Sequence, residues 1–273
     1  MVKNQFIPIA LTVVVFGALC SLLYGFILLL NRFTGTDILL QVRWGDVLVG
    51  LTIYLKTSVD FALLIGNLMA AYDGVKNRIA IEIGTAVGNA LGTLIVLTIW
   101  NFFRDVEWLL ALMIFIAALV LLRLAQDGFE HVHQWDAKFP SWFKTFSGGL
   151  ESTLTKINSF VAPVLKYIIP HPTLKPTKGL TFIGLFVASF TIPFILGLDD
   201  FAGYVPLFSI VNVFGFAIGV FLGHMVLNMA LFISPKKTIT AVKNPLISFA
   251  GSIVFIGLAV WGFWEVYKIL FLH

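Results

Sequence analysis

The sequence predicts an all-α membrane protein with about seven transmembrane helices, six of which form two inverted repeats of three helices each. Composition indicates the membrane class: 59% of the 273 residues are hydrophobic and only 12% are charged. Several apolar runs exceed the roughly 18 residues that a bilayer-spanning helix needs. An internal repeat indicates the arrangement. When the chain is shifted by 139 residues, Asp60 falls on Asp199, and residues 84–89 fall on 223–228 with matching glycine, valine and asparagine. Duplication of a unit with an odd number of spans inverts the second copy.

The expected spans follow the apolar runs of the chain in order, with polar or turn-forming segments between them. They cover residues 7–30, 47–71, 79–100, 109–125, 180–210, 213–233 and 246–270. The chain is expected to have four parts: an extra N-terminal transmembrane helix and link, the first three-helix repeat, a cytoplasmic loop, and the second three-helix repeat. Their boundaries are 1–46, 47–125, 126–178 and 179–273.

Glycine spacing predicts close packing of two of these helices. Small residues at every fourth position let helix backbones approach one another. The two sets are Gly84, Gly88 and Gly92 in the third span and Gly215, Gly219 and Gly223 in the sixth.

The distribution of lysine and arginine predicts the orientation in the membrane. With seven spans, most of the 18 basic residues fall on the side of the N-terminus, and Lys56 lies within a span. Because cytoplasmic loops are enriched in basic residues, we expect the N-terminus in the cytoplasm and the C-terminus outside. The net charge of +4 therefore reflects topology, and it does not indicate nucleic-acid binding.

The cytoplasmic loop, residues 126–178, contains one expected helix. Leu150, Leu154 and Ile157 recur at helical spacing with polar residues between them. This pattern predicts an amphipathic helix on the inner membrane surface. Pro163 is expected to kink the helix, and the prolines that follow are expected to end it.

Carboxylates at membrane depth mark the candidate site. An ionisable side chain inside a bilayer is expensive, so it normally faces a partner or a water-filled path. Hard divalent cations take oxygen ligands, and histidine suits a softer ion such as zinc. Gly197 before the aspartate pair and Pro206 after it predict a broken helix, whose free backbone groups would join the site. The candidate binding residues are Asp60, Asp199, Asp200, Asn89, Asn228 and His224, with Lys56, Ser58, Asn67 and Glu82 in supporting positions.

Each of these side chains also has a purely structural interpretation, which the sequence leaves open. Asp60 can form an ion pair with Lys56, four residues earlier on the same helix face. The two asparagines can bond one helix to another. His224 can be a hydrogen-bonded core histidine, and Glu82 can be a solvated residue at the membrane interface.

Two short motifs resemble a known transporter family. Residues 197–208, Gly-Leu-Asp-Asp-Phe-Ala-Gly-Tyr-Val-Pro-Leu-Phe, resemble the second-repeat signature of the cadmium resistance transporters. Residues 57–61, Thr-Ser-Val-Asp-Phe, are similar to the first-repeat signature. This family belongs to the lysine exporter superfamily, with the tellurium-resistance C-type membrane proteins and manganese exporters. The resemblance implies divalent-cation chemistry, with Asp60 and Asp199 at the repeated acidic position.

The chain departs from the family pattern at three positions. Ser58 stands where the family has asparagine, Phe61 where it has a second aspartate, and Asp200 where it has asparagine. The first repeat therefore offers fewer metal ligands than the family pattern, which leaves the identity of the metal open.

Together these features predict a secondary transporter that exports a divalent metal cation of the manganese, cadmium or zinc type by proton antiport. The alternative is an exporter of a small organic solute such as an amino acid, with the carboxylates as proton relays. The sequence contains no Walker motif for an ATP-driven engine. It also lacks a nucleophile–base pair or metalloprotease motif that would support a membrane enzyme, so no enzymatic activity is expected.

The expected partners are the lipid bilayer and the transported divalent cation, and a homodimer is a candidate assembly. We expect no tightly bound cofactor and no nucleic-acid partner. The expected location is the bacterial inner (plasma) membrane.

Overall fold

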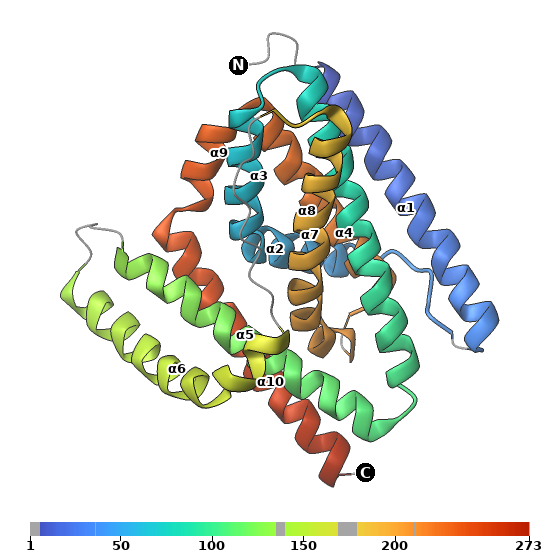
Figure 1. Ribbon diagram of the computed structural model, residues 1–273. Helices are drawn as coiled ribbons and strands as arrows, with labels where there is room; N and C mark the ends of the chain where they lie inside the picture. Colours follow the sequence, from blue (N-terminus) through green and yellow to red (C-terminus); the bar gives the residue numbers. More distant parts are fainter. Residues whose placement is uncertain (1–5, 36, 135–139, 169–178, 210, 273) are drawn as a thin grey trace. The chain divides into compact units, whose positions relative to one another are not determined.

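The computed structural model describes residues 6–35, 37–134, 140–168, 179–209 and 211–272, and for 131–134, 141, 160–168, 195–203, 209 and 247 it describes the backbone alone (Figure 1). Helices are the only regular secondary structure in these residues. They are α1 (Phe6–Thr34), α2 (Trp44–Thr57), α3 (Val59–Ala71), α4 (Val75–Phe103), α5 (Glu107–Gln134), α6 (Ser141–Ile168), α7 (Phe182–Tyr204), the 3-10 helix η1 (Val205–Ser209), α8 (Val213–Ile233), α9 (Pro235–Val242) and α10 (Pro245–Phe271).

Five helices in the described part of the chain are long and apolar enough to cross a membrane: α1, α4, α5, α8 and α10. Helices α2 and α3 together form a sixth candidate span, bent by 65° at a break. The predicted all-α membrane class is thereby confirmed. The expected span over 180–210 corresponds to α7, in which Phe182–Phe194 is the apolar stretch. The count of seven spans and the two inverted repeats stay predictions.

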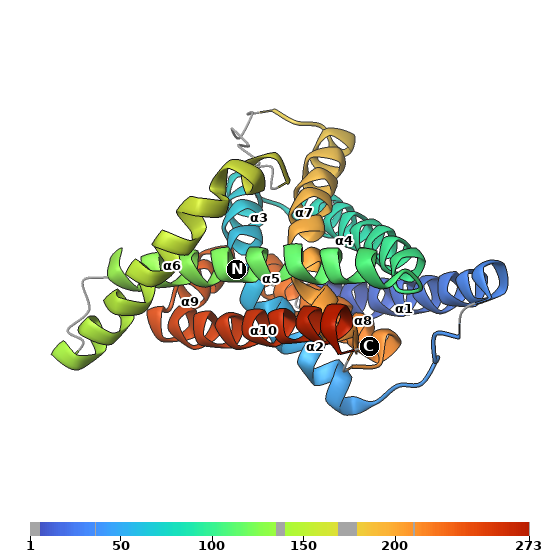
Figure 2. The same cartoon turned by 90° about the horizontal axis from the view of Figure 1, so that it is seen from below.

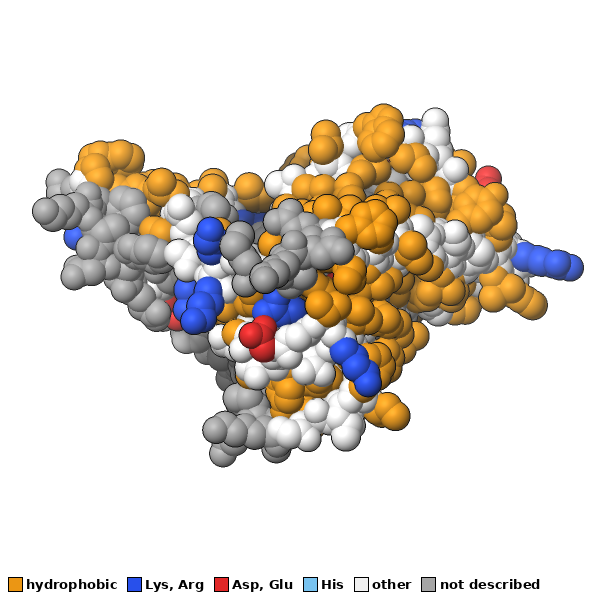
Figure 3. All heavy atoms as spheres, turned by 90° about the horizontal axis from the view of Figure 1, so that it is seen from above, with side chains coloured by type: hydrophobic (Ala, Val, Ile, Leu, Met, Phe, Trp, Pro, Cys, Tyr) orange, Lys and Arg blue, Asp and Glu red, His pale blue; other side chains and the backbone are white. Residues whose placement is uncertain are grey.

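Large apolar side chains on the surface agree with this class. Val14, Ile183 and Val260 are each more than 60% exposed on different helices. Many of the side chains on the face drawn in Figure 3 are hydrophobic, and the basic side chains there stand singly or in small groups. A bilayer can cover surfaces of this kind without the cost of contact with water.

The predicted break between Gly197 and Pro206 corresponds to the end of α7 at Tyr204, after which the chain continues as the 3-10 helix η1. A further break, which the sequence did not predict, lies in the expected second span, 47–71, where α2 and α3 meet at Ser58.

One side-chain hydrogen bond lies at this break. The Thr57 hydroxyl donates to the carbonyl of Tyr54 at 3.2 Å, and the same carbonyl accepts from the N–H of Ser58 at 3.0 Å. A threonine hydroxyl that shares a helix carbonyl in this way often accompanies a bend. Asp60 then falls in the first turn of α3, where the free N–H groups of a helix favour a carboxylate.

Two further boundaries differ from the expectation. Helix α5 continues to Gln134, past the predicted end at residue 125, because Ala125 and Phe129 remain buried. The ring of Phe129 packs edge-on against Phe249 of α10, with 5.8 Å between centroids. The short helix α9 was not expected, since its eight residues contain no sustained apolar pattern.

The chain divides into two compact units. Unit 1 comprises Met1–Phe102, Pro172–Phe201 and Val211–Val242, and unit 2 comprises Phe103–His171, Ala202–Ile210 and Lys243–His273. The predicted division at residues 46, 125 and 178 stays a prediction about the repeats.

Unit 1 is held together by helix pairs that approach at glycines. A Cβ on Gly50 or Gly219 would lie under 3.0 Å from a backbone carbonyl of the other helix, so α2 and α8 cross in close contact. Gly84 and Gly88 of α4 meet α7 in the same way. The close packing predicted from glycine spacing is therefore confirmed at Gly84, Gly88 and Gly219.

Unit 2 is built on α5 and α10, which lie side by side (Figures 1 and 2). Its apolar core draws on α5, α6 and α10. The predicted amphipathic helix is confirmed as α6, but Leu150 and Leu154 pack against this core, while Ile157 is exposed. Helix α6 runs through Pro163 to Ile168, and the prolines expected to end it lie outside the described residues. Its position on a membrane surface stays a prediction.

Candidate functional site

A line of buried polar side chains joins three helices of unit 1. The hydroxyl of Tyr54 in α2 lies 2.5 Å from Nδ1 of His224 in α8, and Nε2 of that ring lies 2.9 Å from Nδ2 of Asn228. The same amide nitrogen donates to Oγ1 of Thr85 in α4, at 2.8 Å. All four side chains are buried. Helices α2, α8 and α4 are thus connected by hydrogen bonds inside an apolar unit.

The assigned orientation of the Asn228 amide implies one tautomer of the histidine. Because Nδ2 of Asn228 is a donor, Nε2 of His224 accepts, and the ring proton lies on Nδ1, toward Tyr54. The ring also packs against Phe61, with 5.1 Å between centroids. His224 therefore has the contacts of a hydrogen-bonded core histidine, and it would lose one of these bonds by binding a metal.

The bend between α2 and α3 adjoins this line. Ser58 separates Tyr54 from Phe61, and the rings of both contact His224. Ser58 is buried, and its Oγ has no hydrogen-bond partner in the described part of the chain. Asp60, two residues further on, is exposed. The bend thus places a buried hydroxyl between two residues of the polar line's surroundings, with Asp60 in the next turn of α3.

Four buried polar atoms of unit 1 retain hydrogen-bonding capacity here. They are Oγ of Ser58, Oε2 of Glu82, Nδ2 of Asn89 and Oδ1 of Asn228. The other carboxylate oxygen of Glu82 accepts from the hydroxyl of Thr12 in α1, at 3.1 Å. An unpartnered buried polar atom costs about 1–3 kcal/mol, so such atoms mark places where a ligand or water is expected.

The structure brings together only some of the predicted site residues. One region contains His224 and Asn228, which lie within hydrogen-bonding distance of each other. Asn228 also bonds to Thr85, which lies on the face of α4 that carries Glu82 and Asn89. Asn67 is exposed on α3, and Lys56 is half-buried near the end of α2. The side chains of the Asp199–Asp200 pair lie outside the described residues, so their predicted meeting with Asp60 stays a prediction. Among the side chains that the structure describes, no three His, Cys, Asp or Glu residues form a metal-binding group.

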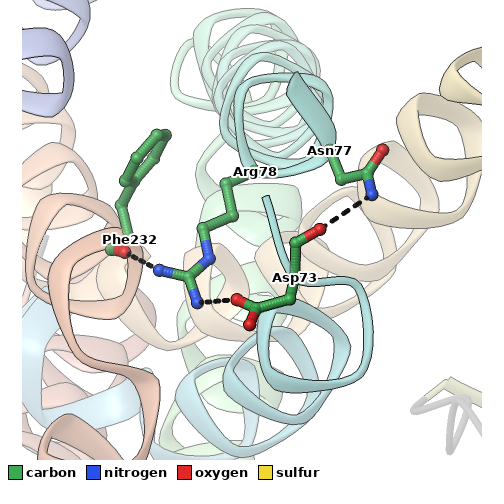
Figure 4. A network of polar contacts seen from close by, with 4 residues as sticks. All are labelled: Asp73, Asn77, Arg78 and Phe232. Atoms are coloured by element: carbon green, nitrogen blue, oxygen red, sulfur yellow. Dashed lines mark hydrogen bonds and ion pairs between the residues drawn. The ribbon is translucent and has the colours of Figure 1, made fainter. Parts of the chain in front are cut away.

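A second polar network lies at the turn between α3 and α4 (Figure 4). Arg78 is buried, and its Nη1 donates to the carbonyl of Phe232 near the end of α8, at 2.5 Å. Its Nη2 forms an ion pair with Asp73 at 2.9 Å, although the Asp73 side chain is 89% exposed. Asn77 donates to the carbonyl of Asp73 at 3.2 Å. Arg78 thus places a positive charge at the C-terminal, electronegative end of α8.

Sequence reasoning missed Tyr54, Thr12 and Arg78. The first two stand alone in apolar runs, where single polar residues carry no periodic signal. Arg78 lies in a polar turn, where a basic residue is usually solvated and was counted only for topology. A basic residue in the first turn of a helix is unfavourable because it opposes the helix dipole. The position of Arg78 was therefore the signal in the sequence that it has a partner on another element.

No family model, curated protein or solved structure matches the chain. The similarity to the cadmium resistance transporters therefore rests on the two motifs alone.

Proposed function

We propose that this protein is a secondary transporter that exports a divalent metal cation in exchange for protons. The observation that carries this proposal is the bent candidate span α2–α3, with Asp60 at the start of its second half and buried polar side chains beside the bend. Interrupted helices with free backbone groups form the ion sites of many transporters. Irregular backbone at membrane depth occurs where it is buried in protein or lines a cavity.

The proposed ligands are oxygen atoms around the bend. Asp60 supplies a carboxylate, and Ser58 and Asn228 supply oxygens that have no partner among the described residues. Oxygen ligands of this kind suit hard divalent cations. In this proposal His224 positions the Asn228 amide through its hydrogen bond, and Asp199 completes the site from the second repeat.

Helix pairing supports the two inverted repeats. The shift of 139 residues carries α2 (44–57) onto residues 183–196 of α7 and carries the start of α4 close to the start of α8. Helix α2 of the first repeat packs closely on α8 of the second, and α4 of the first packs closely on α7 of the second. Each of these pairs is therefore the counterpart of the other under the repeat. Helix α5 corresponds to α10, and these two pack on each other. Two repeats related by a twofold axis would produce these contacts.

The remaining parts of the proposal follow from the sequence. Seven spans place the N-terminus in the cytoplasm and the C-terminus outside, by the distribution of basic residues. We assign the chain to the bacterial inner membrane and to the lysine exporter superfamily on the motif resemblance.

Metal content of expressing cells tests the proposal. Manganese, zinc, cadmium, cobalt and calcium would be measured in cells with the wild-type protein, with Asp60→Asn and with Asp105→Asn. The last is a matched control, because it makes the same change at an exposed position of unit 2. We expect the wild type and the control to lower one metal and Asp60→Asn to lose the effect. Unchanged levels of all five metals, with the protein verified in the membrane, would refute metal export and favour the organic-solute alternative.

A further inference from the structure

Glu82 and Arg78 are ionisable side chains of α4 that lie one turn apart and do not bond to each other. Glu82 is completely buried, with one carboxylate oxygen bonded to Thr12. Arg78 bonds to Phe232 and Asp73. Oε2 of Glu82 and Nε of Arg78 are buried and have no partner among the residues that the structure describes. Opposite charges at this spacing are within reach of one another on a helix. Each side chain therefore retains one buried polar atom that the other could satisfy.

The position of Glu82 relates it to both contacts between α4 and α8. Arg78 of α4 contacts Phe232 of α8, and Thr85 contacts Asn228, so the two helices run in opposite directions here. Glu82 lies between these contacts, about 6 Å along the helix axis from Arg78 and about 4.5 Å from Thr85. A change of charge at Glu82 can therefore affect both contacts between α4 and α8: the one at the polar line and the one at the end of α8.

The surroundings of Glu82 offer it no other strong counter-charge among the described side chains. From α8 the titratable neighbour is His224, connected through Asn228 and Thr85. Over residues 182–194 of α7, the part of this helix in unit 1 whose side chains are described, there is no ionisable group. On α1, Thr12 makes the contact, and the ionisable residues Cys20, Tyr24 and Arg32 lie at least two turns further along. An isolated ionised carboxylate in an apolar interior is much less stable than its protonated form.

We propose that Glu82 carries the coupling proton of this transporter and that Arg78 replaces this proton as its counter-charge when the proton leaves. This inference rests on the proposed function, because it assigns the proton of that exchange. In the described conformation Glu82 holds the proton, and Arg78 joins the α3–α4 turn to the end of α8. When the proton passes from the carboxyl oxygen to water, Arg78 turns toward the carboxylate and releases the carbonyl of Phe232 and Asp73. The charge inside unit 1 then stays balanced, and the end of α8 loses its bond to α4.

Labelling of Glu82 with dicyclohexylcarbodiimide tests the proton site without requiring transport. This apolar reagent modifies protonated carboxyl groups in apolar surroundings, and mass spectrometry of the purified protein in lipid nanodiscs locates the adduct. We expect an adduct at Glu82 that decreases as pH rises, none in Glu82→Gln, and none at the exposed Glu107. Absence of labelling at Glu82 from pH 5 to pH 10 would overturn the proposal.

Variants of the Arg78 network give opposite expected shifts. Arg78→Gln removes the replacing charge, so the midpoint of the labelling curve is expected to rise by about one pH unit or more, a tenfold change in proton affinity. Asp73→Asn removes a competing partner of Arg78, so the midpoint is expected to fall. Arg78→Lys keeps the charge and serves as the matched control. An unchanged midpoint in both Arg78→Gln and Asp73→Asn would overturn the role of Arg78, and Asp73→Asn changes an exposed side chain that folding tolerates.

A transport measurement separates failure of this inference from failure of the proposed function. Proteoliposomes loaded with the metal identified in cells would be given a pH gradient. If the wild type moves no metal, the proposed export is refuted, together with the coupling role of Glu82. If the wild type responds to the gradient and Glu82→Gln responds equally, export stands and the Glu82 assignment is refuted. The expected result is that Glu82→Gln still lets metal equilibrate but no longer responds to the pH gradient.

Discussion

Substitution of Gly219 tests the packing that holds the polar line together. A Cβ at this position would lie under 3.0 Å from the carbonyl of Val47 and the amide nitrogen of Leu51, both backbone atoms of α2. Neither neighbour can move aside as a flexible side chain would, so Gly219→Ala must push α2 and α8 apart. Overpacking of this kind costs about 1–3 kcal/mol.

Gly25→Ala provides the matched control for this change. Gly25 also lies inside a helix of unit 1, but a Cβ there would meet nothing within 4 Å. Both variants gain the same helix propensity, about 0.8–1 kcal/mol for alanine over glycine. The difference between them therefore isolates the packing term of about 1–3 kcal/mol.

Thermal unfolding of the purified variants measures this difference. For units of this size, 1 kcal/mol corresponds to roughly 2–4 °C in Tm, so Gly219→Ala is expected to melt roughly 2–12 °C below Gly25→Ala. Because the separation of α2 from α8 also pulls Tyr54 away from His224, metal export is expected to fall as well. Equal Tm values for the two variants would refute the close crossing of α2 and α8.

Three further predictions concern single side chains. Tyr54→Phe leaves Nδ1 of His224 without its partner, so stability in a denaturation experiment is expected to fall by about 1–3 kcal/mol; an unchanged stability would contradict this bond. Ser58→Ala removes an unpartnered buried hydroxyl, so Tm is expected to rise while metal export decreases, and a lower Tm would show that the hydroxyl has a structural partner. Phe129→Ala is expected to destabilise unit 2 by about 3–5 kcal/mol, whereas Phe146→Ala, at a half-exposed ring, is expected to have little effect on the same melting curve.

Much of the candidate site could be named from the sequence, but its connections could not. Asn228 and His224 share a helix face at four-residue spacing, and in the structure their side chains lie 2.9 Å apart. Their partners Tyr54 and Thr85 lie 170 and 143 residues away in the chain, a separation that no local pattern encodes. The break at Ser58 could not be predicted, because hydroxyl residues also occur inside continuous helices, such as Thr93 and Thr98 in α4.

The sequence by itself determined the helical membrane class and most helix positions, because hydrophobic length and the period of a helix are local properties. The boundaries of α8 were predicted without error at both ends. Only the tertiary structure decided what each buried polar atom bonds to. The sequence indicates that Arg78 is a charge in a turn, but in the structure it bonds to the end of α8. The sequence likewise indicates that Thr12 is part of an apolar span, but in the structure it bonds to Glu82. A buried hydrogen bond needs two groups within about 3 Å, and here the fold brings those groups together from helices far apart in the chain.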